Sequence, residues 1–233
     1  MILLAHGSRH PGADAAVARV ADAVSTLTGA PVHPSHLDFS ARTPTTVAHL
    51  LAAQGHRRAV VVPLLFTRAF HLRHDVPDAL SGATAATGLE FTLADGIGTG
   101  GDVASLLASR IPSGTAHLVL YSVGSSVPGA NGTVAGLAAD IGRRAGVTAE
   151  HVTATGPAGA GASAVLDAVR GSTGQVHVAP LFISPGTLWD TAVGALSSYA
   201  SSARSSPPVT TGVPLAAAVA PLVARRVRQC TAG

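Results

Sequence analysis

Short apolar runs alternate along this chain with segments in which apolar residues recur at helical spacing. The runs at residues 2–5, 59–66 and 89–93 have the length of buried strands, and residues 31–39 can form another. Val17, Val20 and Val24 mark a helix that begins near Gly12. Strands separated by helices predict right-handed crossovers and a parallel sheet with helices on both faces. We expect further helices at residues 43–54, 76–80 and 102–111.

The second half of the sequence repeats this pattern. A shift of 117 residues aligns residues 3–13 with residues 120–130, and six of the eleven positions are identical. A shift of 116 aligns the apolar positions of residues 103–110 with those of residues 219–226. A nearly constant offset over this distance indicates a duplication. We therefore predict two homologous α/β halves, residues 1–113 and 114–233, each with a doubly wound parallel sheet.

The duplication separates residues that serve the fold from residues that could carry chemistry. Gly7, Ser8, Pro11 and Gly12 occur in both copies, which favours a role in the turn and the helix start. Three residues of the same stretch differ in the second copy, where His6, Arg9 and His10 become Val123, Ser126 and Val127. The first half alone therefore carries the candidate chemistry.

Three residues of the first half could bind a metal ion. His6 follows the first strand, Asp38 the second, and His71 the third. Ligands collect at the carboxyl ends of parallel strands, so these side chains can face one crevice. Imidazole and carboxylate suit a divalent metal such as Fe²⁺, Co²⁺ or Ni²⁺, held openly rather than in a closed four-ligand zinc site. The alternative is that they are ordinary polar residues where strands meet loops.

A second group of basic residues lies in the loops that follow the strands. Guanidinium groups pair with carboxylate or phosphate, so this group favours a polyanionic ligand, although solvated loop charges are an alternative. The glycine-rich stretch that begins at Gly96 could expose helix N-terminal amides to a ligand carboxylate, or it could be a plain loop. The candidate binding residues are Arg9, His10, Arg42, Arg68, Arg73, His74 and Gly96.

Composition narrows the classes of function. Hydrophobic residues make up 47% and charged residues 12%, which excludes a disordered chain. There is no lysine, which argues against a P-loop and ATP-driven chemistry, and no basic run suggests a nucleic-acid partner. Cys230 is the only cysteine, so cysteine-based metal clusters and internal disulfides are excluded. The longest apolar run is too short to cross a membrane, and we expect a cytoplasmic protein.

Three motifs in order resemble the sirohydrochlorin chelatases, a family of ATP-independent tetrapyrrole chelatases. The motifs are Ala5-His6-Gly7-Ser8-Arg9, then His36-Leu37-Asp38, and then Pro63-Leu64-Leu65 leading to residues 71–77. The resemblance implies a bilobed fold with a cleft between the halves. It also implies that His6 and His71 are catalytic and bind the metal, while Asp38 stands where the family commonly has a glutamate.

The activity implied by the resemblance is insertion of Fe²⁺ or Co²⁺ into sirohydrochlorin, towards sirohaem or cobalamin. A histidine with a pKa near its ordinary value of about 6.5 can accept a pyrrole proton. The arginine loops would bind the polycarboxylate tetrapyrrole, and neither ATP nor an organic cofactor is expected. Two alternatives stay open: a non-catalytic tetrapyrrole or metal carrier on the same fold, and a phosphate-ester or nucleotide-binding protein. Two fused halves could complete a cleft alone, so we expect a monomer.

Overall fold

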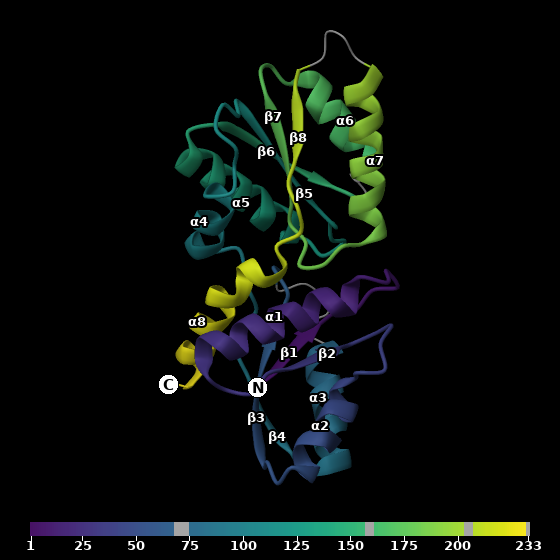
Figure 1. Ribbon diagram of the computed structural model, residues 1–233, viewed down its shortest axis with the longest axis vertical. Helices are drawn as coiled ribbons and strands as arrows, with labels where there is room; N and C mark the ends of the chain where they lie inside the picture. Colours follow the sequence, from purple (N-terminus) through teal and green to yellow (C-terminus); the bar gives the residue numbers. More distant parts are fainter. Residues whose placement is uncertain (68–74, 157–160, 203–206, 232–233) are drawn as a thin grey trace. The chain divides into compact units, whose positions relative to one another are not determined.

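The computed structural model describes residues 1–67, 75–156, 161–202 and 207–231. Its first sheet contains four parallel strands in the order β2-β1-β3-β4 (Figure 1). These strands are β1 (Ile2–Ala5), β2 (His33–His36), β3 (Arg58–Pro63) and β4 (Glu90–Leu93). The predicted α/β class with a parallel sheet is therefore confirmed.

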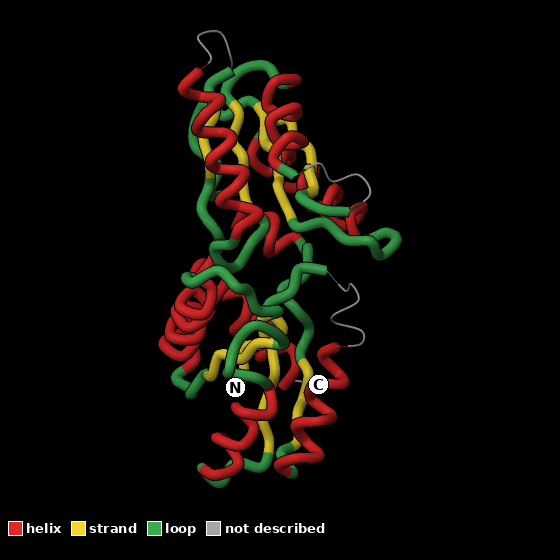
Figure 2. Tube along the Cα trace, turned by 90° about the vertical axis from the view of Figure 1, so that its right-hand side faces the viewer, coloured by secondary structure: helices red, strands yellow, loops and turns green. Residues whose placement is uncertain are grey.

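Helices cover both faces of the first sheet (Figure 2). On one face, Ile2 and Leu4 of β1 pack with Val47 and Leu80 in a single apolar core. Leu3, between them in β1, is fully buried and points to the other face because side chains alternate along a strand. The helices packed within this unit are α1 (Ala13–Thr28), α2 (Pro44–Ala53), α3 (Val76–Thr87), the short 3₁₀ helix η2 (Ala216–Val219) and α8 (Ala220–Thr231).

The second sheet has the same topology as the first. Its order is β6-β5-β7-β8, again all parallel, so each strand takes the place of its counterpart four strands earlier. Its core includes an aromatic cluster in which the ring centroid of Tyr121 lies 6.1 Å from those of Phe182 and Trp189. The strands are β5 (His117–Ser122), β6 (Thr148–Thr153), β7 (Val176–Pro180) and β8 (Val209–Thr211); the helices are α4 (Gly101–Ala108), α5 (Ala130–Ala145), α6 (Ala162–Gly171) and α7 (Thr187–Ser202).

Two compact units result, and each contains a helix from the other half of the sequence. Residues 1–98 and 216–233 form the first unit, and residues 99–215 form the second. Helix α4 follows the first sheet in the chain but packs against α5, whereas α8 follows the second sheet but packs against α1. The predicted boundary at residues 113 and 114 describes the sequence repeat and stays a prediction.

Several predicted elements differ in length from those observed. Helix α3 continues to Thr87 because Val76, Leu80 and Ala83 keep one buried stripe, and it ends where Gly88 adopts φ +71°. Strand β3 ends at Pro63, because a proline has no amide hydrogen to continue the ladder. The predicted start of α2 is confirmed, since the Thr43 hydroxyl accepts a hydrogen bond from the Thr46 amide. None of the helices in the described part of the chain is both long and apolar enough to cross a bilayer.

Candidate functional site

His6 and Asp38 follow neighbouring strands of the first sheet. Ala5 and His36 are register partners at the ends of β1 and β2. The pairing continues past both strands, since the Asp38 amide donates to the His6 carbonyl at 2.9 Å. Both side chains are exposed at this edge. The structure therefore brings these two candidate ligands together by a direct backbone hydrogen bond.

Gly7 makes this close approach possible. Its φ is +101°, and a Cβ atom at this position would lie 1.9 Å from the carbonyl oxygen of Asp38. Gly124 repeats the arrangement in the second unit, with φ +92° and a Cβ position 2.4 Å from the carbonyl oxygen of Thr155. Because both copies need glycine for the same contact, this glycine serves the turn, in agreement with the sequence comparison.

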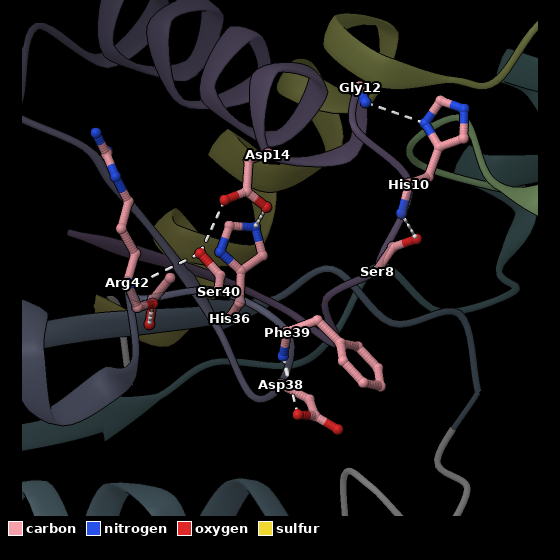
Figure 3. Close-up of polar contacts among 10 residues, drawn as sticks. Ser8, His10, Gly12, Asp14, His36, Asp38, Phe39, Ser40 and Arg42 are labelled. Atoms are coloured by element: carbon pink, nitrogen blue, oxygen red, sulfur yellow. Dashed lines mark hydrogen bonds and ion pairs between the residues drawn. The ribbon is translucent and has the colours of Figure 1, made fainter.

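The turn after Gly7 is stabilised by its own side chains. The Ser8 hydroxyl accepts a hydrogen bond from the His10 amide at 3.1 Å, and the Nδ1 atom of His10 accepts one from the Gly12 amide at 3.1 Å (Figure 3). The second copy keeps the serine contact, because Ser125 accepts from the Val127 amide at 3.1 Å. His10 thus helps to order the start of α1, and its predicted role in ligand binding stays a prediction.

Phe39 links Arg9 to the loop that carries Asp38. The Asp38 carboxylate accepts a hydrogen bond from the Phe39 amide at 2.9 Å, and Phe39 itself has φ +60°, a conformation that is uncommon for a residue other than glycine. The guanidinium carbon of Arg9 lies 4.6 Å from the centre of the Phe39 ring. Sequence reasoning missed Phe39, although an aromatic residue directly after Asp38 in a chain with 3% aromatics was a usable signal.

A buried histidine lies under the same loop. The side chain of His36 is 1% exposed, and its Nε2 atom is 3.5 Å from the Asp14 carboxylate (Figure 3). Neither ring nitrogen has a hydrogen-bond partner among the described residues. Burial lowers the pKa of His36, and the opposing effect of Asp14 does not restore it. Burial therefore favours the neutral form of His36 beside Asp14.

The carboxylate of Asp14 holds the loop through a hydroxyl group. Ser40 donates a hydrogen bond to Asp14 at 2.8 Å, and the Arg42 amide donates to the Ser40 hydroxyl at 3.3 Å. The Arg42 side chain is exposed and extends away from the Asp38 carboxylate (Figure 3). Asp14 and Ser40, which the motifs did not single out, thus fix the loop between β2 and α2.

The glycine-rich stretch is packed against protein. A Cβ atom on Gly96 would lie 2.8 Å from the carbonyl oxygen of Leu65, so close packing requires glycine here. Arg226 of α8 donates to the carbonyl oxygens of Gly96 at 3.0 Å and Ile97 at 2.6 Å. These contacts explain the stretch without a ligand, and a binding role of Gly96 stays a prediction.

The third candidate ligand and part of the basic group fall outside the described residues. Among the described residues, no group of three or more His, Cys, Asp or Glu side chains could hold a metal ion. This finding does not test the predicted set, because His71 is one of its three members. The candidate residues outside the described part of the chain are Arg68, His71, Arg73 and His74.

One family model matches the first half of the sequence. Residues 1–113, just under half of the chain, match the CbiX family model. No curated protein sequence matches this chain at a significant level.

Three solved chelatase structures share the fold along nearly the whole chain. SirB from Bacillus subtilis with Fe³⁺ is 21% identical, with a TM-score of 0.78 over 99% of this chain and 94% of that chain. SirB from Bacillus subtilis subspecies spizizenii in complex with cobalt is 23% identical, with a TM-score of 0.79 over 98% of this chain and 93% of that chain. CbiX, described as the terminal enzyme of siroheme biosynthesis in denitrifying bacteria, is 19% identical, with a TM-score of 0.64 over 98% of this chain and 97% of that chain. The CbiX match over residues 1–113 and the fold shared along nearly the whole chain together support a relationship to the sirohydrochlorin chelatases.

Proposed function

We propose that this protein inserts Fe²⁺ or Co²⁺ into sirohydrochlorin without ATP. The observation that carries the proposal is the pairing of His6 and Asp38 at the ends of adjoining strands, joined by the 2.9 Å backbone hydrogen bond. An imidazole and a carboxylate at one exposed edge can bind a divalent metal without enclosing it. The metal is a substrate here, so open coordination allows its transfer to the tetrapyrrole.

The reaction needs a base as well as metal ligands. The inner pyrrole nitrogens of sirohydrochlorin must lose their protons as the metal enters the ring. We propose that His6 and His71 share metal binding and proton removal, with Asp38 as the carboxylate ligand. A histidine is suited to the proton transfer, because its ordinary pKa lies near neutral pH.

The basic loop residues are proposed to bind the carboxylates of the substrate. Arg9 is the best supported of them, because Phe39 holds its guanidinium on the loop that carries Asp38. An arginine held against an aromatic ring keeps its donors free for a carboxylate. The Arg42 guanidinium extends away from Asp38 and is less suited to this role.

The experiment is a spectroscopic assay of metal insertion under anaerobic conditions. Sirohydrochlorin is mixed with Co²⁺ or Fe²⁺, with and without the protein at a low molar ratio, and its absorbance is followed. Turnover above the spontaneous rate supports the chelatase, whereas stoichiometric binding without turnover would identify a carrier. Comparison of the two metals, and of Ni²⁺, tests which one the site prefers.

A further inference from the structure

The second unit contains a cavity that the proposed chelatase chemistry does not use. Its volume is about 260 Å³, and it lies between strands β7 and β8 and the segment that follows α4. This volume lies just below the usual range of ligand pockets, which begins at about 300 Å³, so the cavity suits only a small molecule. Its wall includes Leu107, Arg110, His177, Ala179, Gly212 and Leu215, all of which belong to the second unit.

His177 presents a hydrogen-bond acceptor at this cavity. Its Nδ1 atom lies 2.9 Å from the Thr210 hydroxyl oxygen, and that hydroxyl donates to the Val176 carbonyl at 3.4 Å. The hydroxyl proton is therefore engaged, so we assign the ring proton to Nδ1 and the lone pair to Nε2. Burial lowers the pKa of His177 and so favours the neutral ring.

The Nε2 atom of His177 has no hydrogen-bond partner among the described residues. The residue is 4% exposed, and its Nε2 lies 3.5 Å from the position that a Cβ atom on Gly212 would occupy. A larger residue than glycine at position 212 would narrow the space beside this nitrogen. A ligand in the cavity that supplies an N–H or O–H group can donate to this acceptor.

The duplication provides an internal control for Arg110. Its counterpart in the first unit is Arg226, whose guanidinium donates to the carbonyl oxygens of Gly96 and Ile97. The counterpart of Gly96 is Gly212, but no side-chain hydrogen bond or ion pair joins Arg110 to any described residue. Arg226 thus stabilises a loop in the first unit, whereas its counterpart Arg110 lines a cavity in the second.

His177 is also specific to the second unit. A shift of 117 residues places it on Val60 of β3, which has no polar group in its side chain. The second unit therefore differs from the first by a histidine acceptor and an arginine donor at one cavity. Apolar side chains of Leu107, Ala179 and Leu215 form much of the remaining wall.

We propose that this cavity binds a small carboxylic acid that carries a hydroxyl or amino group and an apolar side chain. The carboxylate pairs with the Arg110 guanidinium, and the neighbouring O–H or N–H donates to Nε2 of His177. The apolar part of the ligand lies against Leu107, Ala179 and Leu215. This site is independent of the proposed metal site, which belongs to the first unit.

The test compares two probes that differ by one hydroxyl group. Binding of 2-hydroxyisocaproate, as each enantiomer, and of isocaproate is measured by calorimetry on the full chain at up to about 10 mM. We expect one hydroxy-acid enantiomer to bind at least tenfold more tightly than isocaproate. Equal affinity for the two acids, or no binding of the hydroxy acid, would overturn the proposal.

Variants separate the two recognition groups. Arg110→Met should weaken binding of the hydroxy acid at least tenfold, while Arg143→Met, an exposed arginine of α5 in the same unit, should leave the affinity unchanged. His177→Val introduces the residue of the other unit and should remove the preference for the hydroxyl group. Inorganic phosphate that binds as tightly as the hydroxy acid would instead indicate a general anion site and contradict the proposal.

Discussion

The Asp38 amide donates a hydrogen bond of 2.9 Å to the His6 carbonyl, which joins the two candidate metal ligands just beyond the ends of their strands, His6 one residue after β1 and Asp38 two residues after β2. This contact is an extension of the β1–β2 ladder, so the sheet itself sets the spacing of the two residues. The proposed metal site therefore depends on backbone geometry as much as on side chains.

Gly7→Ala should disturb this geometry. The new Cβ atom would overlap the Asp38 carbonyl oxygen, and φ at this position is +101°. We therefore expect the free energy of unfolding to fall by at least about 1–3 kcal/mol. Metal insertion should fall with it. The matched control is Gly82→Ala on the exposed side of α3, which meets no atom within 4 Å and should be neutral or stabilising by up to about 1 kcal/mol. Thermal unfolding of both variants checks this; equal effects would contradict it.

Ser40→Ala should loosen the loop that carries Asp38. The substitution removes the 2.8 Å hydrogen bond to Asp14, which contributes about 0.5–1.5 kcal/mol. We expect a higher KM for the metal and a smaller change in kcat, because Ser40 positions Asp38 and does not contact the reacting atoms. Ser198→Ala, in the exposed part of α7, is the control and should change neither constant. An unchanged KM in Ser40→Ala would rule out the positioning role.

Arg226 and Arg110 should differ in their contributions to stability although they are counterparts in the repeat. Arg226→Met removes hydrogen bonds to two backbone carbonyls and should cost about 1.5–3 kcal/mol. Arg110→Met should change stability by less than about 0.5 kcal/mol. Denaturant unfolding of the two variants measures the contrast, and equal losses would show that Arg110 stabilises its unit as Arg226 does.

Stability should decrease as the pH falls below about 6.5. Burial lowers the pKa of His151 in the folded protein, with a smaller opposing effect from Asn131, so the unfolded chain takes up a proton first. The contribution of His151 is complete above the unfolded pKa and is lost on acidification. His151→Gln can keep a hydrogen bond to Ser122. In this variant the melting temperature should fall less between pH 7 and pH 5 than in the unaltered protein. An unchanged pH profile would contradict this.

Local patterns in the sequence predicted the elements of the fold well. The continuous burial of β1 and the Thr43-Pro44 start of α2 follow from apolar runs and capping, both of which act over a few residues. The packing of α4 and α8 could not be predicted in this way. Each helix has the same apolar stripe whichever unit it joins, and only the course of the whole chain decides the partner.

The candidate site likewise contains residues that the sequence predicted and residues that it did not. The comparison of the two copies separated Gly7 from His6, because turn geometry is shared and chemistry is not. It did not reveal Phe39 or Ser40, whose roles depend on contacts with residues more than twenty positions away along the chain. Such contacts arise only when β1 and β2 pair.

The most direct test of the central claim is the rate of Co²⁺ insertion into sirohydrochlorin by the His6→Ala variant under low metal concentration. We expect a loss of at least about 100-fold relative to the unaltered protein, as is typical when a general base is removed. His49→Ala, an exposed histidine of α2, should retain the full rate. Full insertion by a folded His6→Ala variant would contradict the assignment of the chelatase site to the edge formed by His6 and Asp38.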